Sequence, residues 1–549
     1  KIRENIDNHR DISSLIDPVV QEYIYHKGMY LREPEFKPIL RAKAIAFENA
    51  AGRDREVLDE LGNTVLYGHP DAQAILTKIQ VENDRLLILR NTVEGERPAG
   101  FVSYREIGNE DLFGVLKDME LANLVRGKSS REILLITGIY AREDGTGDGG
   151  VIRDAPQQLL VEVLAKELEK NYSFALFVAE RGTATKEVVY VLERQGFIRP
   201  HMADESDKRT IYMVDMHEPL MFLHNLDTTI KEPFASNPAV LDAVEKNHRK
   251  LQIAMTKLYP GNLVLSLSSG IMYHRLVDRI TALNDVPREP LVPRRLGKNM
   301  CVPFGKILRG KVVPNTVTKT LHTDKVYEPD LSSFTIEPFP YYSPLKSQIE
   351  TIKSFDRPVI LVDDLVHTAN RLQVLVPQLR EDGIPIKKVV VGVLSGYGRD
   401  LMQCLKVPVE SIYSMPNLRQ WFVESTLYPF IGGDTVRREE MKVAGLQPSI
   451  NMILPYATPR LSGCSREALV EFSACCIENS RDLFQVLEAE YRKMYAKNLT
   501  LSRLSEAVIL PLCPDKGSCM EYDENLAASV YLENDLETLW RMKEFMIKG

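Results

Sequence analysis

The stretch Val359-Ile-Leu-Val-Asp-Asp-Leu-Val-His-Thr-Ala-Asn-Arg371 decides how the second half of the chain folds. Its first four residues are apolar, and an unbroken apolar run is typical of a strand buried on both faces of a parallel sheet. Asp363 and Asp364 follow near the carboxyl end of this strand, which is where open α/β sheets bind their ligands. A short turn then leads into a segment with leucines at helical spacing, which predicts an amphipathic helix.

This predicted strand, turn and helix have the chemistry to hold a phosphorylated sugar. Two adjacent carboxylates repel each other and lose solvation when they are buried, so they need partners such as hydroxyl groups or Mg²⁺. The first turn of the following helix offers free backbone N–H groups and the positive end of the helix dipole, which favour a phosphate. Together these features predict a site for a ribose phosphate.

Residues 359–371 resemble the PRPP-binding signature of the type I phosphoribosyltransferases, in which four hydrophobic residues, two acids and two hydrophobic residues precede a small phosphate loop. The resemblance implies that Asp363 and Asp364 hold the ribose hydroxyls of PRPP and its Mg²⁺. It also implies that His367 accepts a proton from the base, which suits a side chain with an ordinary pKa near ~6.5. The residues that would wrap the 5′-phosphate are His367, Thr368, Ala369, Asn370 and Arg371. Ala369 and Arg371 depart from the family pattern, which has a glycine and a hydroxyl residue there.

Three further segments fit this resemblance, and two of them have a plainer alternative. Asn262–Gly270 predicts a strand and a small-residue turn, and the residues implied to approach the pyrophosphate are Ser268, Ser269 and Gly270. Pro287–Lys325 holds nine Lys/Arg against two acids, so we expect either a basic loop over the pyrophosphate or a solvated surface loop. The candidate hood over the second substrate consists of Trp421, Phe422, Tyr428 and Phe430, which are alternatively ordinary core residues.

The N-terminal part predicts a second, mixed sheet. Strands are expected over residues 85–90, 99–105, 132–140, 174–178 and 210–215, and helices over residues 157–170 and 185–195. This order resembles the GNAT acyltransferase fold. Two motifs carry the resemblance: Arg-Glu-Asp-Gly-Thr-Gly at 142–147, which fits the R-x-x-G-x-G loop of that family, and Leu-Glu-Arg-Gln-Gly-Phe at 192–197, which is similar to its closing motif.

The GNAT resemblance implies that backbone N–H groups of the loop bind the pyrophosphate of acetyl-CoA. The implied CoA-binding residues are Arg142, Gly145, Thr146 and Gly147. The loop also carries acids beside this anion site, and Leu192 stands where the family has its general-acid tyrosine, with Tyr190 out of register. The alternative is therefore a module that binds a ligand or a neighbouring domain without acyl transfer.

Length and composition predict several domains in an α/β protein, because single cores stop growing near ~250–300 residues. We expect an N-terminal arm (1–30), a GNAT-like mixed-sheet domain (31–217), a linker (218–236), a phosphoribosyltransferase-like parallel-sheet domain (237–435) and a mainly helical C-terminal region (436–549). The chain has 549 residues, a net charge of −7 and seven cysteines without a C-x-x-C pair. These features predict a soluble cytoplasmic protein without metal-binding cysteines. Because it begins at Lys1 without Met, the sequence is also compatible with a piece of a longer chain.

The expected function is PRPP-dependent phosphoribosyl transfer to a nitrogen base, with Mg²⁺ bound at Asp363 and Asp364. Two alternatives remain open: a regulatory or scaffold protein that binds PRPP or a nucleotide without turnover, and an acetyl-CoA-dependent N-acyltransferase. The expected partners are small molecules and a second copy of the chain in a homodimer. Net acidity and the lack of a basic repeat studded with aromatic residues argue against nucleic acid, and no apolar run reaches the ~20 residues needed to span a bilayer.

Overall fold

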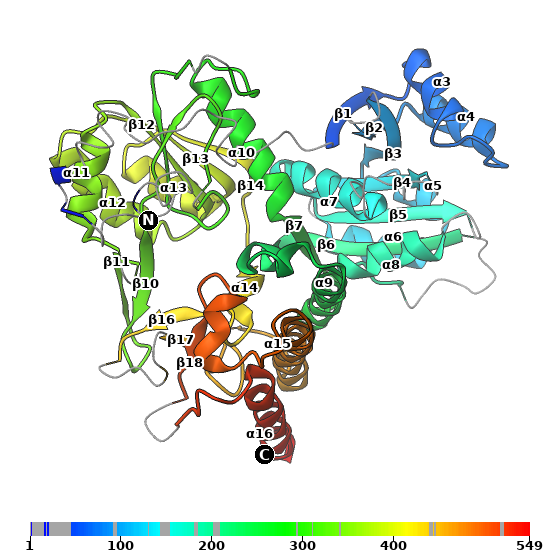
Figure 1. The fold of residues 1–549 in the computed structure, drawn as a ribbon. Coiled ribbons are helices and arrows are strands. Elements are labelled where there is room, and N and C mark those ends of the chain that lie inside the picture. Colours follow the sequence, from blue (N-terminus) through cyan, green and yellow to red (C-terminus); the bar gives the residue numbers. More distant parts are fainter. Residues whose placement is uncertain are drawn as a thin grey trace.

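The computed structural model describes residues 45–91, 96–129, 131–142, 154–180, 185–200, 209–291, 295–309, 311–339, 342–438, 443, 446–459, 461–516 and 521–548, and the isolated positions 2, 16, 17, 19 and 20. The described chain is an α/β protein with three sheets. In Figure 1 the first sheet lies on the right, the parallel sheet at the upper left, and the C-terminal helices at the bottom. No helix among the described residues is long and apolar enough to cross a membrane.

The first sheet is mixed and has eight strands in the order β1-β2-β3-β4-β5-β6-β15, with β7 also paired to β6. Its strands are β1 (Ile45–Ala51), β2 (Arg85–Asn91), β3 (Arg97–Ile107), β4 (Ile133–Ala141), β5 (Phe174–Glu180), β6 (Arg209–His224), β7 (Asn262–Ser268) and β15 (Gln420–Val423). Strands β1 to β4 pair antiparallel, β4 and β5 pair parallel, and β5 and β6 pair antiparallel. This is the mixed order that the GNAT resemblance implies, and every strand expected there is present.

Three helices of this part begin at a residue whose side chain caps the helix. The side chains of Asp54, Asp118 and Thr185 each accept a hydrogen bond from a backbone N–H of the first turn of α3, α6 and α8. Helix α7 buries leucine and valine residues against β3 and β4. The helices are α3 (Arg55–Asn63), α4 (Ala72–Glu82), α5 (Leu112–Leu116), α6 (Met119–Lys128), α7 (Ala155–Glu167) and α8 (Lys186–Arg194).

Strand β6 continues well beyond the expected strand 210–215 and into the expected linker. The register of its pairing with β7 shifts between Asp215 and Leu220, next to Pro219, which cannot donate to a ladder and is tolerated at such irregularities. The apolar residues 220–223 then pair with β7 on one side and β15 on the other. The irregular linker predicted at 218–236 therefore begins inside a strand, because the apolar run after Pro219 finds two partners.

Strand β7 forms as expected but belongs to the first sheet, in parallel register with β6. The helices on either side of it are α9 (Pro238–Leu258) and α10 (Ser269–Leu283). Asn237 caps α9 as its sequence predicts, accepting from the backbone N–H groups of Ala239 and Val240. Helix α10 packs on β13 (Ile386–Ser395) of the second sheet. The predicted first strand of the parallel-sheet domain therefore lies in the first sheet, and the helix that follows it contacts the second.

The second sheet is parallel throughout and has the order β14-β13-β12-β8-β9. Residues 359–366 form its central strand, buried along their whole length. The predicted parallel sheet is therefore present, although β7 is not part of it. Its elements and helices are β8 (Met300–Pro303), β9 (Val317–Thr318), α11 (Leu345–Lys353), β12 (Val359–Val366), α12 (Asn370–Glu381), β13 (Ile386–Ser395), α13 (Gly396–Cys404) and β14 (Val409–Met415).

The C-terminal region contains strands as well as the expected helices. A third sheet of five strands joins β10 (Thr323–Tyr327), β11 (Phe334–Pro338), β16 (Asp434–Val436), β17 (Gln447–Ile450) and β18 (Leu512–Pro514). The remaining helices are α14 (Glu424–Leu427), α15 (Arg466–Tyr495) and α16 (Ala528–Lys548). Within residues 436–549 the long helices α15 and α16 predominate, and the short strands β17 and β18 are elements that the sequence did not predict.

Candidate functional site: a charged cavity at the end of β12

The carboxyl end of β12 opens into a cavity of about 330 Å³, within the range of small-molecule sites. Residues 363–365 and 367–372 line it, so the predicted signature does face a cavity. The opposite side is built by segments far away in sequence. These contribute Lys306, Lys325, Ile336, Gln420, Trp421, Phe422, Val423, Thr426, Leu427, Asp434, Met452, Pro459 and Leu461.

Asp364 uses its carboxylate to hold the neighbouring loop. Oδ2 accepts from the backbone N–H of Lys306 at 2.6 Å, and Oδ1 accepts from that of Ile307 at 2.9 Å. The loop comes this close because residue 305 is glycine: a Cβ there would lie 2.5 Å from Asp364 Oδ1 and 2.7 Å from Asp363 Oδ1. Gly305 is a residue that the sequence alone did not single out, because its neighbours in space are distant in sequence.

Of the two acids, Asp363 has the carboxylate that can still accept a hydrogen bond from a ligand. Its Oδ1 accepts from the backbone N–H of Asp364 at 2.8 Å and lies 3.7 Å from a guanidinium nitrogen of Arg371. Burial raises the pKa of Asp363 to about 7, against the opposing effect of Arg371. A hydroxyl group or a cation that reached this carboxylate would relieve the cost of its burial.

Cations surround the acids. Lys306 and Lys325 line the cavity with Arg371, and Asp434 from β16 lies opposite them. Burial lowers the pKa of Lys306 to about 8 and raises the pKa of Asp434 above its ordinary value. Two of these cations, the lysines, belong to the predicted basic stretch, which is therefore not a single loop: it contains β8, β9 and part of β10. Asp434 was not predicted, because it comes from the third sheet.

The signature loop begins α12. Ala369 has the left-handed backbone conformation, with φ 50° and ψ 21°, at the position where the family pattern has a glycine. The amide of Asn370 donates to the Thr368 hydroxyl at 2.8 Å. His367 Nδ1 lies 2.8 Å from the hydroxyl of Ser395 at the end of β13, and burial lowers the pKa of His367. Burial thus favours the neutral imidazole of His367, and the contact with Ser395 orients the ring.

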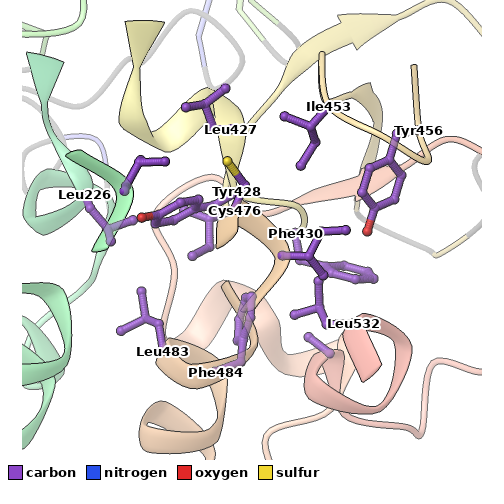
Figure 2. Close-up of a cluster of buried hydrophobic side chains, with 14 of the residues drawn as sticks. Leu226, Leu427, Tyr428, Phe430, Ile453, Tyr456, Cys476, Leu483, Phe484 and Leu532 are labelled. Atoms are coloured by element: carbon purple, nitrogen blue, oxygen red, sulfur yellow. The ribbon is translucent and has the colours of Figure 1, made fainter. Parts of the chain in front are cut away.

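The candidate hood residues divide into two pairs. Trp421 and Phe422 on β15 line the cavity. Tyr428 and Phe430 are fully buried in the largest hydrophobic cluster, where Figure 2 shows them with residues such as Leu226 and Phe484. Their positions confirm the alternative of core packing for this second pair.

Ser268, Ser269 and Gly270 do not line this cavity. Ser268 caps α10 at the end of β7, where its hydroxyl accepts from the backbone N–H of Ile271 at 3.5 Å. The predicted role at the pyrophosphate fails because β7 pairs with β6 of the first sheet. In the structure the loop after β8, residues 304–307, occupies the place beside Asp363 and Asp364.

The predicted CoA loop lies largely outside the described residues. Gly145, Thr146 and Gly147 fall in the part that is not described; Arg142 follows β4 and donates its backbone N–H to the Ala99 carbonyl at 3.0 Å. Strands β4 and β5 pair only through Leu134–Ile136 and Ala175–Phe177, although both continue further. Leu192 is buried in the core, while Tyr190 is 38% exposed on α8.

No protein-family model and no curated protein match this chain. Solved structures similar to part of it include the catalytic domain of Tetrahymena GCN5 histone acetyltransferase in complex with coenzyme A, at 11% identity and a TM-score of 0.22, covering 32% of this chain and 96% of that one. Drosophila melanogaster polyamine N-acetyltransferase is similar at 8% identity and a TM-score of 0.23, and the match covers 31% of this chain and 99% of that one. The NatC complex bound to Gag peptide and CoA is similar at 11% identity and a TM-score of 0.20, and the match covers 31% of this chain and 98% of that one. None of these similarities supports the phosphoribosyltransferase resemblance.

Proposed function

We propose that the cavity at the end of β12 binds PRPP and transfers its phosphoribosyl group to a nitrogen nucleophile. One observation carries the proposal: the Asp363 carboxylate and the cations of Lys306, Lys325 and Arg371 face a single cavity at the start of a twelve-residue helix. A ligand that hydrogen-bonds to the carboxylate and also pairs with all of these cations has hydroxyl groups and more than one phosphate. PRPP has both.

The cavity assigns a part of the ligand to each side chain. The 5′-phosphate would lie on residues 368–371, where the start of α12 and the Arg371 guanidinium favour an anion. Lys306 and Lys325 would bind the pyrophosphate, whose departure requires concentrated positive charge in a closed site. Asp363 would accept from a ribose hydroxyl. Both oxygens of Asp364 already accept backbone N–H groups, so Asp364 would position the loop.

Mg²⁺ fits the acids of this cavity only in part. Asp363 and Asp434 are carboxylates with a raised pKa that a hydrated cation would stabilise in their charged form. They would hold the ion, and Asp364 would not. Bound Mg²⁺ would supply charge neutralisation at the pyrophosphate.

The acceptor would lie against the aromatic wall. Trp421, which is only partly buried, offers flat apolar surface for a ring, whereas Phe422 packs on Phe472 in the core. His367 would take a proton from the attacking nitrogen on Nε2, in the tautomer whose Nδ1–H donates to the Ser395 hydroxyl oxygen, because no hydrogen bond occupies Nε2 within the described residues. A neutral imidazole in this position is a suitable base.

Calorimetric titration of the purified protein with Mg²⁺ and PRPP tests the binding. We expect Asp363→Asn and Arg371→Gln each to weaken binding at least about 10-fold, since each removes a charge-assisted contact. Asp356→Asn and Lys353→Gln remove equivalent charges from exposed positions before β12 and should bind like the wild type. Lack of PRPP binding by the wild type refutes the proposal.

Turnover is tested separately by measuring pyrophosphate release with a panel of nucleobases and amines. Release that requires one of these nucleophiles, and that His367→Ala slows about 100-fold or more, supports transfer. Binding without release under any of these conditions rejects transfer and leaves the alternative of a PRPP-binding regulatory protein.

A second candidate function is acyl-CoA binding by the first sheet. One observation favours it: β4 and β5 stop pairing after three residue pairs, and β4 leads into the segment with the predicted pyrophosphate loop. An acyl-CoA chain would lie between the parted strands and reach the loop at residues 142–147. Acetyl-CoA titration tests this proposal. Gly145→Asp should abolish binding, whereas Gly127→Asp adds the same charge where a side chain meets open space and should not.

A further inference from the structure

A second polar cluster lies at the carboxyl ends of β6, β7 and β15, near the centre of Figure 1. These strands run parallel. His224 ends β6, His248 lies on α9, and Glu424 begins α14. One potential ligand atom from each of the three lies within 4.8 Å of the other two. None of these side chains lines the cavity at β12.

The Glu424 carboxylate is buried and incompletely satisfied. Its side chain is 0% exposed, and that of His248 is 14% exposed. His248 Nε2 and Glu424 Oε2 approach to 2.7 Å as an ion pair, and neither atom has a well-aligned hydrogen bond to any described residue. A cation bound beside both atoms would take the place of the proton that this buried ion pair requires on His248.

The surroundings hold the three side chains in place. The Tyr428 hydroxyl donates to Glu424 Oε1 at 3.2 Å, which leaves Oε2 toward the histidines. His224 Nε2 contacts the hydroxyl of Ser266 on β7. The rings of His224 and His248 are perpendicular, with centroids 4.2 Å apart. Outer contacts of this kind, which orient imidazole and carboxylate groups, are typical of metal sites.

We propose that His224, His248 and Glu424 bind a divalent transition-metal ion of the zinc type, with one coordination position left open. Two imidazoles and one carboxylate are a ligand set that suits Zn²⁺ and leaves a position for water in a tetrahedral site. The partial exposure of His248 provides a route to solvent. The competing explanation is a buried His248–Glu424 ion pair with His224 packed against it.

Titration of chelator-treated protein with ZnCl₂ by calorimetry distinguishes the two explanations. We expect one Zn²⁺ per chain, with binding lost to below detection in His224→Asn, His248→Gln and Glu424→Gln. Tyr428→Phe keeps all three ligands but removes an outer hydrogen bond, and should weaken binding by about 10–100-fold. The matched control is His217→Gln: His217 lies on the same strand and has its own carboxylate partner, Asp215, at 2.8 Å, and its loss should leave Zn²⁺ binding unchanged.

A Co²⁺ titration of the wild type gives a readout that needs no variant, because tetrahedral Co²⁺ absorbs visible light intensely. The appearance of this absorption, and its removal by one equivalent of Zn²⁺, supports the proposal even if a substitution prevents folding. The proposal is overturned if the wild type binds neither ion at micromolar concentration. It is equally overturned if His217→Gln loses binding as His248→Gln does, or if the three ligand variants fold and retain it.

Discussion

Glu162 on α7 and Arg275 on α10 form an ion pair of 2.6 Å between the first and second sheets. The Tyr413 hydroxyl on β14 donates to the other oxygen of Glu162 at 2.7 Å. Glu162 is 2% exposed, and Arg275 also lies over the ring of Tyr413. One buried carboxylate therefore joins three elements, which fixes how the first sheet meets the helix that covers the second.

Glu162→Ala should destabilise the protein by about 2–4 kcal/mol, because it leaves the Arg275 guanidinium, which is only 21% exposed, and the buried Tyr413 hydroxyl without their partner. The measurement is the free energy of unfolding from urea denaturation followed by circular dichroism. Lys166 also approaches Glu162, at 3.1 Å, but its side chain is 33% exposed, so Lys166→Ala should cost less than about 1 kcal/mol. Equal costs for both variants would mean that burial does not strengthen the Arg275 pair.

Much of this arrangement follows from local sequence, but its long-range pairing does not. The apolar run before Asp363 predicts the central strand of a parallel sheet, and Asn237 predicts the start of α9, because each depends on neighbouring residues. The apolar run in β7 predicts a strand equally well, yet nothing in it specifies β6 as its partner. The pairing of β6 with both β7 and β15 is decided by contacts between residues far apart in the chain.

The same limit applies to the candidate sites. Residues 363–371 were predicted because they are contiguous, whereas Asp434 joins them only through the third sheet. His224, His248 and Glu424 come from three segments without a spacing motif, so the sequence contains no local signal for their cluster. The role of Gly305 depends on a contact between its backbone and Asp364. No local pattern in the sequence predicts that contact.

Gly305→Ala should disrupt the cavity, because the added Cβ would lie 2.5 Å from Asp364 Oδ1 and 2.8 Å from the Asp364 backbone nitrogen. We expect a loss of about 1–3 kcal/mol in unfolding free energy and PRPP binding weakened at least about 10-fold, measured by urea denaturation and calorimetry. Gly127→Ala in α6 meets open space and should slightly stabilise the protein. Wild-type behaviour of Gly305→Ala would show that the loop does not need its close approach to the acids.

Ala369→Gly should relieve backbone strain at the start of α12. Ala369 has φ 50°, and the left-handed region costs an L-residue about 1–2 kcal/mol, a cost that glycine avoids. Because glycine also gains freedom in the unfolded chain, we expect a net stabilisation of about 0.5–1 kcal/mol, measured by thermal unfolding. The matched change is Ala165→Gly within α7, where the backbone is helical, and it should destabilise the protein by about 1 kcal/mol. Destabilisation of similar size at both positions would contradict the left-handed conformation of residue 369.

Asp363→Asn should stabilise the ligand-free protein in a pH-dependent way. The pKa of Asp363 is raised from 3.8 to about 7 in the folded protein, so the folded state holds its proton more tightly than the unfolded state. The wild type therefore loses stability as the pH rises from about 4 to about 7, and this loss levels off above that range. Asparagine has no proton to lose, so the variant does not show this loss of stability.

Thermal unfolding midpoints of both proteins, measured between pH 4 and pH 9, test this prediction. The midpoints should differ little at the acidic end, and the midpoint of the variant should become increasingly higher than that of the wild type toward pH 7. Asp356→Asn, at an exposed position, should follow the wild type throughout. A difference between Asp363→Asn and the wild type that does not change with pH would show that burial does not perturb this carboxyl group.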